Sequence, residues 1–167
     1  MALLSNSSGT KDRVHPLRTP GALLFAYGTL QFADVLTALI DRVPQTQAAR
    51  VTGWRAAALA DRSYPGLVAA NGTATGLALA GLTNAEIQLI DDYESGPYVL
   101  RQLALDDGFT AWAYVWTDEA AVLAYDWSMP RFADERLAVF VRQCRTWRAG
   151  YEAAGRVSAG LDRPQDG

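Results

Sequence analysis

The stretch Leu23-Leu24-Phe25-Ala26-Tyr27-Gly28-Thr29-Leu30 joins a short apolar run to a glycine-containing turn. An apolar run of this length that ends at a glycine is typical of a buried strand rather than a helix. Gly28 allows the backbone to approach another group closely or to adopt a positive φ, and successive amides in such a turn can bind an anion. We therefore predict a ligand-binding loop over Tyr27 to Leu30. The alternative is a simple strand-ending turn, which is the usual role of such a tetrapeptide.

A second informative stretch is Leu89-Ile90-Asp91-Asp92-Tyr93-Glu94-Ser95-Gly96-Pro97-Tyr98. Because each helical residue advances by about 100°, Glu94 shares one helical face with Ile87 and Ile90, and its carboxylate is expected to enter an apolar environment. Asp91 lies one turn earlier on the same side. Desolvation and repulsion by Asp91 should both raise the pKa of Glu94, as general acid/base catalysis near neutral pH requires.

The simpler interpretation is that Asp91, Asp92 and Glu94 only solvate the end of a helix. Two features argue against it: the place of Glu94 on the apolar face, and the turn Ser95-Gly96-Pro97, which ends the helix and brings Tyr98 back past the acid. Tyr98 could hydrogen-bond a ligand or belong to the core, since an aromatic residue at the start of a strand takes either role.

The rest of the chain alternates between strand and helix patterns. Strands are predicted over 48–60, 73–80, 98–105 and 110–116, and helices over 32–42, from Thr83 to about Glu94, and over 133–154. Thr83 and Glu86 fit a capping box, and Tyr64-Pro65-Gly66 predicts a turn. This order predicts an α+β domain with a mixed or mainly antiparallel sheet.

The composition predicts one domain that needs no disulfides, because half of the 167 residues are apolar and a fifth are charged. We predict flexible tails over 1–21 and 157–167, a core over 22–120, and a C-terminal helical extension over 121–156 that packs on the core. The net charge of −3 argues against a nucleic-acid partner, and no apolar stretch has the length of a signal-peptide core or a bilayer span. We expect a cytoplasmic protein, monomeric or weakly dimeric, without a membrane partner.

Patterns for other chemistries are missing from the sequence. No Gly-rich phosphate motif follows Gly28, and no cluster with metal-ligand spacing occurs, so we expect neither a cofactor nor a metal. Cys144, the only cysteine, falls on the apolar stripe of the last predicted helix and is interpreted as a packed apolar residue. The only histidine, His15, lies in the predicted tail, too far from Cys144 in our interpretation to activate it.

Five features in a fixed order resemble the gamma-glutamylcyclotransferase-like family, including its plant avirulence-induced branch. They are the apolar run, Tyr27-Gly28-Thr29-Leu30, Tyr64-Pro65-Gly66, Leu89-Ile90-Asp91-Asp92-Tyr93-Glu94 and Tyr98-Val99-Leu100-Arg101. The likeness covers residues 23–116 and continues more weakly through the last helix. It implies a mixed, mainly antiparallel, barrel-like sheet with flanking helices.

The resemblance also implies an activity: expulsion of an amine from a gamma-glutamyl amide with release of 5-oxoproline, without a cofactor. By position, Glu94 matches the family's acid/base glutamate, Tyr27, Gly28, Thr29 and Leu30 match the loop that binds the glutamyl part, and Tyr98 matches the tyrosine that follows the glutamate.

Two other function classes stay open on the sequence. One is a relative that binds a small gamma-glutamyl ligand but does not turn it over. The other is an interaction protein that uses the basic last helix, although such arginines most often form a solvated face; these arginines are Arg136, Arg142, Arg145 and Arg148.

Overall fold

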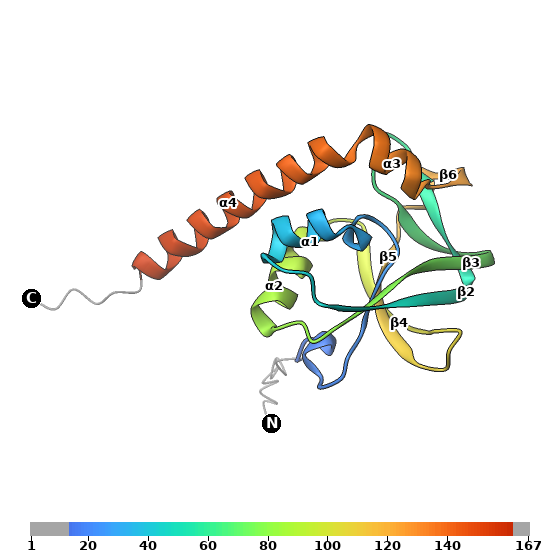
Figure 1. Cartoon of the computed structure of the whole chain (residues 1–167), viewed down its shortest axis with the longest axis horizontal. Helices are drawn as coiled ribbons and strands as arrows, with labels where there is room; N and C mark the ends of the chain where they lie inside the picture. Colours follow the sequence, from blue (N-terminus) through green and yellow to red (C-terminus); the bar gives the residue numbers. More distant parts are fainter. Residues whose placement is uncertain (1–13, 162–167) are drawn as a thin grey trace, which may run out of the picture.

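The computed structural model describes residues 14–161, with side chains to residue 155, and its centre is one curled sheet of six strands (Figure 1). The strands are β1 (Leu24–Ala26), β2 (Gln45–Leu59), β3 (Gly66–Ala80), β4 (Tyr98–Ala104), β5 (Thr110–Trp116) and β6 (Val122–Asp126). Their order is β4-β5-β1-β3-β2-β6. The pairings of β5 with β1 and β3 are parallel and the others are antiparallel. The predicted fold class is confirmed.

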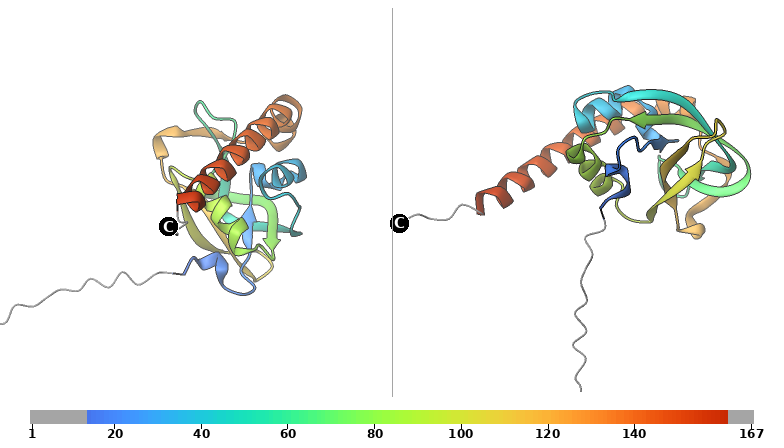
Figure 2. Two further views of the ribbon diagram at one scale, coloured as in Figure 1. Left: turned by 90° about the vertical axis from the view of Figure 1, so that its left-hand side faces the viewer. Right: turned by 90° about the horizontal axis from the view of Figure 1, so that it is seen from below.

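Helices flank this sheet, and the longest of them projects well beyond it (Figures 1 and 2). The helices are α1 (Ala33–Ile40), α2 (Asn84–Tyr93), α3 (Met129–Glu135) and α4 (Leu137–Leu161), and the 3₁₀ turns are η1 (Pro16–Arg18), η2 (Thr29–Gln31) and η3 (Glu119–Ala121). None of the helices within residues 14–161 is both long and apolar enough to cross a bilayer.

The apolar side chains form two main clusters. In the first, side chains from α1, α2 and α4, such as Leu39, Ile90 and Cys144, pack against strand residues such as Leu24. The second consists almost wholly of strand residues, including Phe25, and fills the curl of the sheet. Because successive side chains of a strand point to opposite faces, the three residues of β1 contribute to both clusters.

The strand β3 pairs with two different neighbours along its length. Near its end Leu77 pairs with Ala26 of β1, whereas near its start Leu67 pairs with Val115 of β5. The first half of β3 therefore curls back to β5 and closes the sheet into a partial barrel. Beyond Ala26 the chain has to leave the sheet, because β3 and β5 pair directly with each other there.

The elements differ most from the sequence prediction in three places. Strand β3 begins at Gly66 rather than 73, because its first residues already pair with β2, in which Val68 lies opposite Arg55. Strand β6 was missed. The last predicted helix is two helices, since α3 starts earlier under a Ser128 cap and the backbone breaks at Arg136, which has φ −129°.

The terminal segments are in part attached to the domain. We predicted a tail over 1–21; its described part, 14–21, packs on α2, with Leu17 buried and Arg18 bonded to Gln88. His15 contacts Asp91 at 3.2 Å. At the other end α4 continues through Leu161 into the predicted tail, and residues 1–13 and 162–167 lie outside the described part of the chain.

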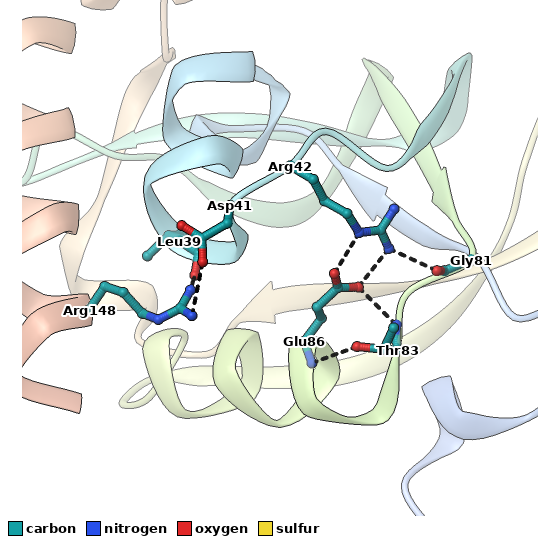
Figure 3. A network of polar contacts seen from close by, with 7 residues as sticks. All are labelled: Leu39, Asp41, Arg42, Gly81, Thr83, Glu86 and Arg148. Carbon is teal, nitrogen blue, oxygen red and sulfur yellow. Dashed lines mark hydrogen bonds and ion pairs between the residues drawn. The ribbon is translucent and has the colours of Figure 1, made fainter. Parts of the chain in front are cut away.

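The start of α2 is held by the predicted capping box (Figure 3). The Thr83 hydroxyl accepts from the Glu86 amide at 3.2 Å, and the Glu86 carboxylate accepts from the Thr83 amide at 2.9 Å. Arg42, just after α1, donates to both Glu86 oxygens at 2.6 and 2.7 Å and also to the Gly81 carbonyl at 3.0 Å. Its guanidinium lowers the pKa of Glu86. The network fixes one end of the helix whose other end carries Glu94.

The end of α1 is also tied to α4. Arg148 donates to the Leu39 carbonyl and to the Asp41 carboxylate, the latter at 3.2 Å (Figure 3). Of the four arginines in the interaction-protein hypothesis, Arg148 is thus half-buried and used inside the fold, whereas Arg136, Arg142 and Arg145 are exposed.

We expect Gly76→Ala to be strongly destabilising, because the added Cβ would fall inside the van der Waals distance of the Ala26 carbonyl oxygen where β1 meets β3. Overpacking of this kind costs about 1–3 kcal/mol or more. Urea unfolding followed by circular dichroism measures it. Gly72→Ala, on the same strand, is the control: its Cβ would have its nearest neighbour at 3.9 Å, so the free energy of unfolding should change little. Equal losses in both variants would contradict this explanation.

Candidate active site

A cavity of about 210 Å³ opens where β1 ends. Its size suits a group of amino-acid dimensions, since pockets for drug-sized ligands are larger, at roughly 300–1,000 Å³. It is lined by β1 and the turn that follows it (Leu24 to Leu30), the loop residues Tyr64 and Pro65, the end of α2 from Tyr93 to Ser95, the strand tyrosines Tyr98 and Tyr114, and Phe140 of α4. The structure therefore brings the two stretches singled out in the sequence to one cavity.

Glu94 lies at the C-terminal end of α2, where its amide donates to the Ile90 carbonyl at 2.8 Å. Ile87 and Ile90 are fully buried on the same face, as the helical spacing predicts. Within the described part of the chain, no hydrogen bond or ion pair engages the Glu94 carboxylate. The acid therefore enters the cavity without a protein partner.

Burial raises the pKa of Glu94 to about 7. The direction agrees with the prediction, but the predicted repulsion by Asp91 is wrong as a cause, because burial alone accounts for the rise. The Asp91 carboxylate is engaged elsewhere: it accepts from the Tyr114 hydroxyl at 3.1 Å and contacts the His15 ring at 3.2 Å. A carboxyl with a pKa near neutrality can both take and return a proton.

Four phenols surround this acid, and burial is the main cause that raises the pKa of each, with a smaller contribution from the Glu94 charge in every case. Each hydroxyl already has a protein partner. The contacts are Tyr27 to the Tyr114 carbonyl at 2.5 Å, Tyr98 to the Pro65 carbonyl at 2.8 Å, Tyr114 to Asp91 at 3.1 Å and Tyr93 to the Cys144 sulfur at 3.4 Å. Tyr98 therefore lines the cavity with its ring while its hydroxyl supports the loop at Pro65.

The turn after β1 is a single 3₁₀ turn beginning at Thr29. Gly28 has φ −126°, so a positive φ is not the reason for the glycine. A Cβ at this position would lie 2.7 Å from Cγ of Pro65, so glycine allows the turn to pack directly against that loop. The hydrogen bonds of the turn begin at the Gln31 amide, which donates to the Gly28 carbonyl at 3.1 Å. The amides of Gly28, Thr29 and Leu30 precede it, and amides at the start of a helical turn have no acceptor within that turn.

Sequence reasoning missed several residues of the cavity. Tyr64 and Pro65 were interpreted only as a turn, although their place in the family resemblance was a usable signal. Tyr114 was assigned to an alternating strand, and Phe140 reaches the cavity from α4, a contact that no local pattern reveals. His15 was excluded as a tail residue, yet it contacts Asp91.

Neither thiol catalysis nor metal binding is indicated by the described residues of this region. Cys144 is fully buried, and burial raises its pKa, as expected for a packed apolar residue. Among the described residues, no three His, Cys, Asp or Glu side chains are grouped as a metal site.

Comparison with known proteins agrees with this geometry. The family described as "Gamma-glutamyl cyclotransferase, AIG2-like" matches residues 24–129, which include β1, the Gly28 turn, the Tyr64–Pro65 loop and Glu94. The chain belongs to this family. The resemblance inferred from the sequence is thereby confirmed for the gamma-glutamyl cyclotransferase, AIG2-like family.

Individual members of the family are distant relatives. AIG2-like protein D of Arabidopsis thaliana is 30% identical over 100 residues, which cover 56% of this chain and 66% of the relative. The match thus spans just under two thirds of that protein.

Solved structures show the same fold. The solution structure of At3g28950.1 from Arabidopsis thaliana has a TM-score of 0.57 at 19% identity and covers 88% of this chain and 94% of its own. A structure named gamma-glutamyl cyclotransferase has a TM-score of 0.50 at 16% identity, covering 58% of this chain and 67% of its own.

We expect Glu94→Gln to stabilise the protein at pH 8 by about 3 kcal/mol, because the variant has no carboxylate to ionise in the cavity. The size follows from the difference between the Glu94 pKa of about 7 in the folded state and the ordinary value of 4.5. The folded state binds the proton more tightly than the unfolded state. The contribution of Glu94 to stability is therefore fully present below about pH 4.5 and is lost as the pH rises through 7.

Urea unfolding of both proteins at pH 4 and pH 8 measures the effect. The gain should be present at pH 8 and absent at pH 4. Glu119→Gln, at an exposed position on η3, controls for the loss of one negative charge. A stabilisation of equal size at both pH values would contradict the burial of an ionising Glu94.

Proposed function

We propose that this protein is a gamma-glutamyl cyclotransferase that converts a gamma-glutamyl amide into 5-oxoproline and a free amine, with Glu94 as the general acid/base. The observation that carries the proposal is one carboxyl with a pKa of about 7 that lies in an amino-acid-sized cavity without a protein partner. Membership of the gamma-glutamyl cyclotransferase, AIG2-like family supports it.

The first step closes a ring within the substrate. The α-amine and the γ-carbonyl carbon belong to one molecule, so the attack already has the proximity that other reactions must acquire from the enzyme. The α-amine arrives mostly as an ammonium group. The Glu94 carboxylate takes one of its protons, the nitrogen lone pair forms a bond to the γ-carbon, and the carbonyl electrons move to oxygen as an oxyanion.

The second step breaks the original amide bond. Glu94, now protonated, gives its proton to the departing nitrogen while the oxyanion returns its electrons and re-forms the carbonyl. After the first transfer the ring nitrogen still carries two protons. It loses one of them to the regenerated Glu94 carboxylate, which passes it to the released amine, so the products are 5-oxoproline with one amide N–H and an ammonium ion, and Glu94 is again a carboxylate. No external oxidant or co-reactant is needed.

The backbone amides of Gly28, Thr29 and Leu30 have two possible tasks in this scheme. They can hold the α-carboxylate of the glutamyl group, or they can stabilise the oxyanion that develops at the γ-carbonyl. Both tasks require donors that the fold leaves without partners. The tyrosine rings around Glu94 exclude water, which strengthens every electrostatic contact within the cavity.

A relative that binds the ligand without turnover is the second candidate. It is favoured by one observation: within residues 14–155 no hydrogen bond orients the Glu94 carboxylate toward the reacting atoms. A binding protein with the same cavity predicts saturable binding of gamma-glutamyl compounds and no 5-oxoproline.

The deciding experiment incubates the purified protein with gamma-glutamyl amines and dipeptides and follows 5-oxoproline by mass spectrometry. We expect product from the wild type and a loss of about 10²- to 10⁴-fold in kcat for Glu94→Gln, since this is the usual contribution of general acid/base catalysis. Circular dichroism of the variant serves as the folding control. Binding without product in the wild type would identify the silent relative instead.

The dependence of kcat/KM on pH provides an independent check. Because Glu94 must be ionised in the free enzyme to accept the first proton, kcat/KM should rise with pH and level off above a pKa of about 7. A profile that is already level at pH 5 would require a base with an ordinary carboxyl pKa and would exclude Glu94 in this role.

A further inference from the structure

The last turn of α2 is contacted by segments that lie outside residues 24–129, the part of the chain that matches the family. Each of the three residues before Glu94 makes one such contact. These contacts join Asp91 to His15 at 3.2 Å, Asp92 to the Tyr151 hydroxyl at 3.0 Å, and Tyr93 to the Trp147 ring with 5.1 Å between the ring centroids. The N-terminal segment and α4 therefore meet on the turn that carries Glu94.

Tyr93, the residue directly before Glu94, is held by α4 at both its ring and its hydroxyl. Its ring meets the Trp147 ring edge-on, at an interplanar angle of 77°. Its hydroxyl oxygen lies 3.4 Å from the Cys144 sulfur. The Trp147 ring in turn stacks on the Tyr151 ring, with 5.1 Å between centroids and 21° between planes. An aromatic stack on α4 thus supports the last helical residue of α2.

The helix α4 is itself fixed to the domain by contacts that do not involve α2. It runs past α1 and α2 before it projects beyond the sheet (Figures 1 and 2). Arg148 donates to the Leu39 carbonyl and to the Asp41 carboxylate at the end of α1 (Figure 3). Phe140 and Val141 are buried in the core cluster that α1 and α2 share. α4 is therefore an anchored surface against which the end of α2 packs.

Such support is needed because Glu94 would be better solvated outside the cavity. Within the described part of the chain its carboxylate has no hydrogen bond or ion pair, and burial disfavours its ionised form. Helix ends unfold locally at little cost. Unwinding this end would break the hydrogen bond from the Glu94 amide to the Ile90 carbonyl and release the carboxylate to water. It would also pull the Tyr93 ring away from Trp147, so the aromatic contact opposes it.

We propose that Trp147 is a positioning residue for Glu94: its packing on Tyr93 keeps the last turn of α2 helical and the carboxylate inside the cavity. This inference rests on the proposed cyclotransferase function and gives α4, which lies beyond the residues that match the family, a part in the reaction. Trp147 does not line the cavity, so it acts through Tyr93 and not on the substrate. Tyr151 assists by stacking on Trp147 and donating to Asp92.

The kinetic test compares the wild type with Trp147→Leu on a gamma-glutamyl compound that yields 5-oxoproline. We expect kcat to fall roughly tenfold or more, since small misplacements of a catalytic group have effects of this order. KM should change by less than about twofold, because the Gly28 turn is untouched. The rise of kcat/KM with pH should move from about 7 toward the ordinary carboxyl value as Glu94 becomes hydrated. Trp147→Phe, which keeps an aromatic ring against Tyr93, should restore most of both properties.

Trp54→Leu is the matched control, because Trp54 is also half-buried but packs on the strand cluster and does not line the cavity. It removes the same indole, and the pH profile and kcat should stay those of the wild type. Trp147→Met, which keeps an apolar side chain of intermediate size, takes the place of Trp147→Leu if that variant does not fold by circular dichroism. A profile that stays near pH 7 in the Trp147 variant, or moves equally in Trp54→Leu, overturns the inference.

A measurement without turnover separates this inference from the proposed function. The pKa of the Glu94 carboxyl is read from a ¹³C NMR titration, with the signal assigned by its loss in Glu94→Gln. It should lie near 7 in the wild type and in Trp54→Leu, and at least one pH unit lower in Trp147→Leu. A wild type that yields no 5-oxoproline but shows this pattern refutes the enzyme and supports the positioning role. Equal values in all three proteins, or an ordinary carboxyl value in the wild type, overturn that role.

Other titrating groups do not produce this pattern. Burial raises the pKa of each group that faces Glu94, so none of them titrates between pH 4 and 8; they are the phenols of Tyr27, Tyr93, Tyr98 and Tyr114 and the thiol of Cys144. The charged neighbours on the same turn are Asp91 and Asp92, together with His15 of the N-terminal segment. All three are unchanged in the Trp147 and Trp54 variants, so their contribution is the same in each comparison.

Discussion

The candidate site depends on how the long strand β3 closes the sheet. At one end β3 pairs with β1 and at the other it returns to β5, where Leu67 lies opposite Val115. Because β1 has only three residues, the chain must leave the sheet where these two strands meet. The same closure delivers Tyr64 and Pro65, which precede β3, directly to the turn at Gly28. Without this curl the two segments would be on separate parts of the surface.

Close backbone packing makes the closure possible. At Gly28 a side chain would collide with Pro65, and at Gly76 it would collide with the Ala26 carbonyl. A third glycine, Gly66, has the Trp116 side chain where its Cβ would be. Each of the three lies where two segments of the closed sheet touch. Glycine is needed at these positions because the segments pack closely, and this packing, not loop flexibility, sets the shape of the cavity.

Burial in this cavity makes the ionised form of Glu94 energetically unfavourable. An ionised carboxylate that lacks a partner destabilises the fold near neutral pH, and the surrounding phenols give it no hydrogen bond because they are used elsewhere. The fold tolerates the acid because α2 is fixed at its other end by the Thr83–Glu86 capping box and by Arg42. A helix that is fixed at its start thus holds a carboxyl group whose ionised form is disfavoured by burial, which is an arrangement typical of proton-transfer sites.

The sequence by itself determined the features that depend on neighbours along the chain. The capping box, the buried face shared by Ile87, Ile90 and Glu94, the β4–β5 hairpin and the strand before Gly28 all follow from local spacing and turn chemistry. Only the tertiary structure decided how Pro65 meets Gly28 and why Asp91 contacts His15 and Tyr114 instead of Glu94. These contacts join residues far apart in the chain, and their geometry is set by the curl of β3, which no local pattern of residues encodes.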